Sequence, residues 1–157
     1  MGAYGTLINF SPISNVTATP GSSDKLGERT FHNSVEYVYV YSSDAASVGH
    51  AVCMTGTTGY TVSVGTVTQF DIPVGWVQHA TLTTGTYGWV ATRGIINMQM
   101  SAAVSVAIGG LVVAGANGFM VGTNNYASAA TATVPGPAVA RALSNVASTT
   151  SGYFYVR

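Results

Sequence analysis

The chain has 157 residues, a length that fits one domain, and charged side chains make up only 6% of it. An average globular protein carries roughly 25%, and here five basic residues balance five acidic ones. A DNA-binding surface typically neutralises about six to ten phosphates with Lys and Arg, more than the whole basic complement of this chain. The composition therefore sets nucleic acid aside as a partner, and so little charge favours an assembly over a free monomer.

The first part of the chain, residues 1–27, is rich in Gly, Ser, Thr, Asn and Pro and shows no sustained periodicity. We interpret it as an extended N-terminal arm, followed by a β-rich domain over residues 28–157. Apolar side chains would be awkward in a free tail, so we expect those of the arm to contact the same domain or a neighbouring subunit. These candidate contacts are Tyr4, Leu7, Ile8, Phe10, Ile13 and Val16.

The start of the chain also lacks the basic and apolar segments of a signal peptide. We therefore expect no secretion signal and a protein made in a cytoplasm. A membrane partner is not expected either, because the apolar run over residues 101–116 is shorter than the roughly 20 residues that a spanning helix needs.

The strongest strand signal lies over residues 34–41, where valines alternate with tyrosines and both faces are expected to be at least partly covered. Residues 50–55 and 60–64 predict a hairpin around the glycines of residues 56–59. Further strands are predicted at residues 66–72, 76–82, 87–92, 95–101, 104–108, 111–114, 119–122 and 153–156.

The end of the chain is less clear than its middle. Residues 123–137 are interpreted as a loop of small residues, and residues 138–147 fit either a helical turn or a strand that pairs with the last one. Turns recur about every ten residues, which is typical of barrels and sandwiches. We therefore predict an all-β fold, a compact β-barrel or β-tulip-like domain or a sandwich.

Titratable residues form no catalytic pattern. His32, His50 and His79 have no Cys, Asp or Glu at metal-ligand spacing, so we expect no metal site and no cofactor. A triad could be imagined from His79 and Asp71, but no Gly-x-Ser-x-Gly elbow supports it. Cys53 lies in an apolar run and is expected to be a buried small hydrophobe. The sequence predicts a protein that is not an enzyme.

A glycan-binding or adhesion module is the main alternative from another functional class. Residues that could form a sugar-stacking platform are Tyr37, Tyr39, Tyr41, Trp76, Tyr87 and Trp89. Aromatic residues make up 10% of the chain and are ordinary in strands, so this pattern does not decide the function.

One motif is more specific than the composition, Gly-Thr-Tyr-Gly-Trp-Val-Ala-Thr-Arg-Gly over residues 85–94. It resembles the Tyr-Gly-Trp-Val-x-x-x-Gly signature of small tailed-phage virion proteins known as capsid decoration, cement or head-stabilising proteins. Residues 26–29, 35–40 and 45–52 are similar, in the same order, to other segments of that family. The resemblance covers residues 26–157 in pattern.

Within this motif we expect structural roles for Tyr87, Gly88, Trp89 and Gly94. Gly88 would allow a close approach of backbones, and Trp89 would supply a large apolar anchor. Gly94 would permit a bend or a bulge in the strand.

The resemblance implies a virion structural protein on the outer capsid surface, which stabilises the shell by bridging subunits of the major capsid protein. It also implies a homotrimer, with the N-terminal arm reaching over the major capsid protein or a neighbouring copy. A tail or neck component of the virion stays open as an alternative, beside the glycan-binding module.

Overall fold

The computed structural model describes residues 13, 16–20, 25–55, 59–64, 73–101, 105–122, 140–147 and 150–157. These residues form ten strands and one short 3-10 turn, η1 (Ala116–Gly118). The strands are β1 (Arg29–His32), β2 (Val35–Ser42), β3 (Ala51–Met54), β4 (Thr61–Ser63), β5 (Gly75–Val77), β6 (Thr86–Gln99), β7 (Leu111–Ala114), β8 (Met120–Gly122), β9 (Ala140–Ala142) and β10 (Ser151–Val156). None of the described segments is a helix long and apolar enough to cross a membrane.

Five strands close into a small barrel in the order β2-β4-β3-β5-β6, because β6 returns to pair with β2. Only the contact between β2 and β4 is parallel. β-branched side chains suit the pleated, half-buried surface of a strand, and valines fill the interior of the barrel. The valines of this core are Val38, Val40, Val52, Val62, Val64, Val77 and Val90, joined by Ala46 and Leu82. The predicted all-β barrel is confirmed.

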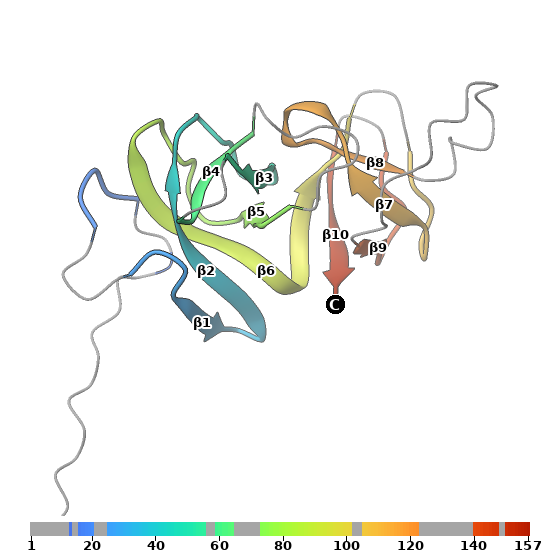
Figure 1. Cartoon of the computed structure of the whole chain (residues 1–157). Coiled ribbons are helices and arrows are strands. Elements are labelled where there is room, and N and C mark those ends of the chain that lie inside the picture. The colour runs from blue at the N-terminus through green and yellow to red at the C-terminus, as the bar shows by residue number, and fades with distance from the viewer. Residues whose placement is uncertain are drawn as a thin grey trace, which may run out of the picture.

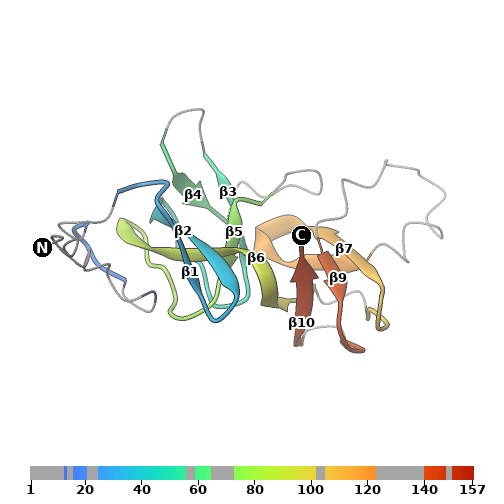
Figure 2. The same ribbon diagram turned by 90° about the horizontal axis from the view of Figure 1, so that it is seen from below.

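A second sheet continues from the barrel in the order β6-β10-β9-β7-β8. A parallel bridge between Met100 and Met120 brings the end of β6 back against β8, so this sheet curls over its own core. Phe154, Ile96 and Met98 are fully buried there. Both views show the two halves side by side, with β6 running from the first into the second (Figures 1 and 2).

Strand β6 serves both halves because it contains a β-bulge. Tyr37 of β2 pairs with Ala91, but the next residue, Glu36, pairs with Arg93, so Thr92 is an extra residue. Since side chains alternate between faces, one extra residue reverses the alternation. Ala91 before the bulge and Ile96 after it therefore contact the same core cluster. The predicted break between residues 92 and 95 is wrong, because β6 bends there without ending.

Most other sequence-predicted strands are confirmed. β2 has buried side chains on both faces, β3 and β4 pair as antiparallel neighbours, and β7, β8 and β10 lie where alternation placed them. The ambiguous segment 138–147 contains strand β9, which pairs with β10, and no helix in its described residues.

Four predicted elements differ or lie outside the described residues. The strand predicted over residues 76–82 is limited to β5, and Leu82 only forms an isolated bridge with Ala46. In the segment 104–108, Val106 forms an isolated bridge with Val146. The strand predicted over 66–72 and the loop over 123–137 lie outside the described residues.

Only a few residues of the N-terminal segment are described, and they contact the barrel. Ile13 and Val16 are partly buried, each against a different core cluster. Thr17 exchanges two backbone hydrogen bonds with Tyr87, of 3.0 and 2.8 Å. The other candidate contacts of the arm, Tyr4, Leu7, Ile8 and Phe10, lie outside the described residues. The division of the chain after residue 27 stays a prediction.

Candidate attachment surface

The centre of the motif at residues 85–94, residues 88–91, is buried in the scaffold of the protein. Trp89 is only 3% exposed, and its ring centroid lies 5.0 Å from that of Tyr39. Gly88 is buried opposite Val40, and Gly94 has a φ of +113° where β6 leaves β2 for β10. The indole N–H of Trp89 has no hydrogen-bond acceptor among the described residues. The centre of the motif therefore shapes the fold, whereas Arg93 near its end is exposed.

The burial of aromatic side chains also weakens the glycan-binding alternative. Four of the six aromatic residues considered for a sugar-stacking platform are buried in the core, namely Tyr37, Tyr39, Trp76 and Trp89. Tyr41 and Tyr87 are partly buried and pack against each other, with ring centroids 4.9 Å apart. These six side chains therefore form no exposed platform, because strand alternation points most of them inward.

Acidic residues of the described ranges are engaged in local structure. Glu36 accepts a hydrogen bond of 2.6 Å from Arg29, Glu28 accepts one from the backbone N–H of Lys25, and Asp44 accepts one from the backbone N–H of Ala45. No three His, Cys, Asp or Glu side chains gather as metal ligands within those ranges. Cys53 is buried, as predicted.

Two histidines sit in partly apolar surroundings. The His79 ring is hydrogen-bonded to the Tyr37 hydroxyl, with a Nε2 to Oη distance of 3.0 Å, and the His50 ring packs on Phe119. Burial lowers the pKa of His50, which a hydrogen bond with Gln99 partly offsets. Burial, with a smaller contribution from the positive charge of His32, also lowers the pKa of His79. Both rings therefore favour their neutral form in the folded chain.

Acidification is expected to destabilise the fold through these two rings. Because their pKa values are lowered from 6.5, the unfolded chain binds more protons just below that pH, and stability falls as the pH drops. We expect the Tm, followed by circular dichroism, to fall between about pH 7.5 and about pH 5.5. The fall should be clearly smaller in His50→Gln and only slightly smaller in His32→Gln, because that exposed ring makes the minor contribution to the lowered pKa of His79. An equal fall in all three proteins would assign the acid sensitivity to other groups.

The outer side of the second sheet carries exposed apolar and basic side chains in a row. Ile95 of β6 is paired with Tyr155 of β10, Tyr155 with Arg141 of β9, and Arg141 with Leu111 of β7. Residues paired directly across antiparallel strands point to the same face, about 5 Å apart. All four are exposed, Ile95 by 56% and Tyr155 by 43%.

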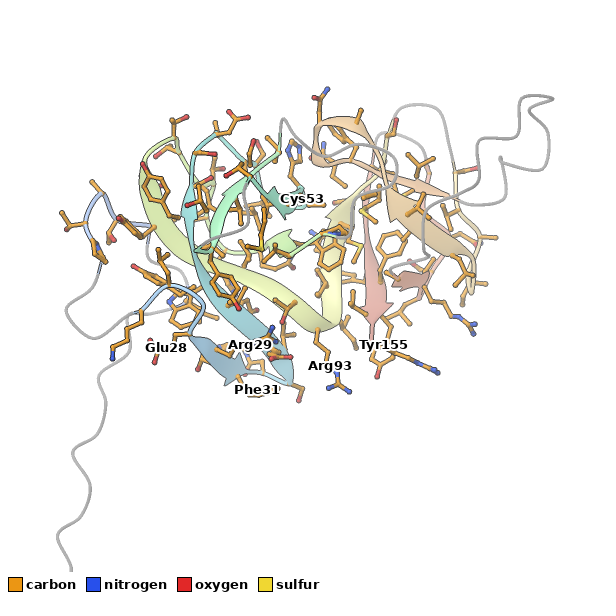
Figure 3. All side chains as sticks on the ribbon, viewed as in Figure 1. Glu28, Arg29, Phe31, Cys53, Arg93 and Tyr155 are labelled. Carbon is orange, nitrogen blue, oxygen red and sulfur yellow. The ribbon has the colours of Figure 1, made fainter. Side chains whose placement is uncertain are left out.

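Two more arginines extend this row towards the barrel. The register between β6 and β10 ends where Val156 pairs with Gly94, and Arg157 and Arg93 are the next residues of the two chain segments. Both are exposed, and Arg93 pairs in turn with Glu36 of β2. We call this surface the arginine face and define it by Arg93, Ile95, Leu111, Arg141, Tyr155 and Arg157. Figure 3 shows Arg93 and Tyr155 along one side of the molecule, the lower side in that view.

Exposed aromatic residues flank the arginine face at both ends. Tyr153 follows Tyr155 at the alternate position of β10 and is 59% exposed. Phe31 of β1 is 72% exposed and pairs with Glu36, which pairs with Arg93. Phe31 lies on the same side of the molecule as Arg93 (Figure 3). The exposed surface therefore runs from β1 across β6, β10 and β9 to β7.

Comparison with known proteins finds a likeness among solved structures. No protein-family model and no curated protein sequence matches the chain. Among solved structures, the N base of the head fiber gp8.5 of bacteriophage phi29 matches with a TM-score of 0.54 and 9% sequence identity. The match covers 77% of this chain and 92% of that chain. The two chains share a fold.

The head fiber base thus has the same arrangement of strands as this chain, and it belongs to a phage virion. At 9% identity the side chains on the two surfaces are largely different. A contact surface must therefore be argued from the residues of this chain itself. The arginine face combines exposed apolar and basic side chains, four of which are connected by register pairs.

Proposed function

We propose that the chain is a non-enzymatic structural protein of a phage virion, a decoration or cement protein that binds the outside of the capsid. The observation that carries the proposal is the arginine face, an exposed apolar and basic surface on a rigid sheet. The chain shares its fold with the base of a phage head fiber, and its motif at residues 85–94 resembles a signature of capsid decoration proteins. The acidic residues of the described ranges take part in local contacts, and the centre of the motif is buried. The arginine face is therefore the best candidate for attachment.

The protein would stabilise the shell mechanically, by holding neighbouring capsid subunits together. A copy that contacts adjacent subunits of the major capsid protein buries surface that is exposed again if the shell opens. Any ligand that binds only the intact state stabilises it, by about 2.7 kcal/mol at a concentration of 100 times its Kd. Many copies on one shell would add their contributions. The proposal includes self-association as a homotrimer, which the 6% content of charged residues favours.

Heads of the parent phage prepared without this protein provide the test. We expect the purified chain to cosediment with these heads in a saturable manner and to raise the temperature at which they burst. Heads that already carry the protein are the control and should take up no more. Sedimentation of the chain alone should give the mass of three copies.

Absence of binding to the bare heads would contradict the proposal. A tail or neck location would then be tested by cosedimentation with purified tails. Exposed Tyr153 and Tyr155 keep a glycan ligand as the second candidate, because exposed aromatic rings stack on sugars. Binding on a glycan array that is lost in Tyr153→Ala would support that candidate.

A further inference from the structure

We propose, building on the capsid-binding function above, that the arginine face docks onto an acidic and partly apolar protein surface of the phage head. The starting observation is an uncompensated positive charge. Arg93, Arg141 and Arg157 are exposed, and none of them has an ion-pair partner among the described residues. The only ion pair found there joins Arg29 to Glu36.

The strand register concentrates this charge. Arg157 and Arg93 each follow directly on the last pair of the β6–β10 register, Val156 with Gly94, so two positive charges are placed at the same end of that strand pair. Glu36, the carboxylate paired with Arg93 in the register, is held by Arg29 through a contact of 2.6 Å. The fold therefore leaves both arginines without an ion-pair partner among the described residues. Carboxylates of a partner would supply it, since guanidinium binds a carboxylate through two parallel hydrogen bonds.

Apolar residues between the arginines favour a protein as the partner. Ile95, Leu111 and Tyr155 lie in the same row and are exposed. Tyrosine and arginine dominate the binding energy of protein interfaces, whereas contacts to nucleic acid phosphates need no aliphatic side chains. The mixture of side chains thus fits a protein surface with carboxylates around an apolar centre.

A second copy of this chain fits the face poorly. A two-fold self-contact would place arginines against arginines, which costs binding energy. The acidic residues in the described ranges are also engaged locally, by Arg29, by the backbone of Lys25 and by the backbone of Ala45. The partner is therefore expected to be a different protein of the head.

The test measures binding of the full chain to heads prepared without it, using Arg93→Glu, Arg141→Glu and Arg157→Glu singly and together. Each reversal is expected to weaken binding on the order of tenfold. Binding of the wild-type chain should also weaken as salt rises from about 0.05 to about 0.5 M. Lys25→Glu is the matched control, because it makes the same charge change at an exposed residue outside the face. It should bind like the wild-type chain.

Folding of each variant is checked by circular dichroism and Tm. If a reversal to glutamate unfolds the chain, Arg93→Gln and Arg157→Gln remove the charge without inverting it. These milder variants are expected to weaken head binding several-fold.

Four results would overturn the proposal, and they are distinguishable from one another. Unchanged binding in the arginine variants, with a loss in Ile95→Ser, would show an apolar contact without acidic groups. Binding to a DNA duplex that the reversals abolish would identify a nucleic acid partner. If the arginine reversals changed the mass of the chain measured without heads, the partner of the face would be a second copy of this chain. A wild-type chain that does not bind heads would remove the proposed function itself.

Discussion

Replacing Trp89 with alanine is expected to lower the free energy of unfolding by about 3–5 kcal/mol. The indole is 3% exposed and packs on Tyr39 in the cluster that both halves of the fold share. Its removal loses apolar contacts and leaves a cavity that the flanking strands β2 and β6 cannot close, since they are fixed by pairing. Urea unfolding followed by circular dichroism measures the change. A loss below about 1 kcal/mol would contradict the burial of the ring.

Phenylalanine substitutions separate the ring from its N–H group. The N–H of Trp76 donates to the sulfur of Met120 at 3.4 Å, whereas that of Trp89 has no acceptor among the described residues. A buried donor without a partner costs about 1–3 kcal/mol, so its removal offsets part of the lost packing. Trp89→Phe should therefore destabilise the fold less than Trp76→Phe, which removes the same atoms. The reverse order would indicate an acceptor for Trp89 in the rest of the chain.

Strand alternation made much of the fold predictable. The Tyr and Val pattern of β2 has side chains of two core clusters on its two faces, so both faces carry a sequence signal. The glycine-rich connection between β3 and β4 and the aromatic end of β10 gave equally local signals. These elements need no knowledge of distant partners, because burial and turn chemistry are written into neighbouring residues.

Strand β1 was not predicted, for a local reason. Most of its side chains are exposed, so it shows no apolar alternation. Its turn to β2 has positive φ values at Asn33 and Ser34, of 49° and 64°. Two such residues form the tight hairpin turn that usually contains glycine, and serine gives little sign of it.

The arginine face was not predictable from the chain order. Arg93, Arg141 and Arg157 are far apart in sequence, and their spacing gave no reason to group them. The register of β6, β10 and β9 brings them to one face. A signal that could have pointed to it is the alternation at the end of the chain, where Tyr153, Tyr155 and Arg157 are exposed and Phe154 and Val156 are buried. Aromatic residues on both faces of β10 indicate that each face makes contacts, one with the core and the other with a partner.

Replacing Gly94 with alanine is expected to destabilise the fold by about 2–4 kcal/mol. Gly94 has a φ of +113°, which L side chains rarely adopt, at the point where β6 exchanges β2 for β10. A Cβ atom there would lie 2.8 Å from the carbonyl oxygen of Ser34 and 3.2 Å from the Cα atom of Val35. Both are backbone atoms of the β1–β2 hairpin and cannot rotate away. The hairpin must shift, which disturbs the bend that joins the two halves.

Gly109→Ala is the matched control for this substitution. Gly109 also has a positive φ, of +79°, but a Cβ atom there would meet nothing within 4 Å. Its replacement should cost about 1–2 kcal/mol from backbone strain alone. The excess loss in Gly94→Ala, measured by urea unfolding of both variants, reports the clash with the hairpin and the greater strain at +113°. Equal losses would mean that the hairpin yields easily, and β6 would then join the two halves less rigidly than its continuous pairing indicates.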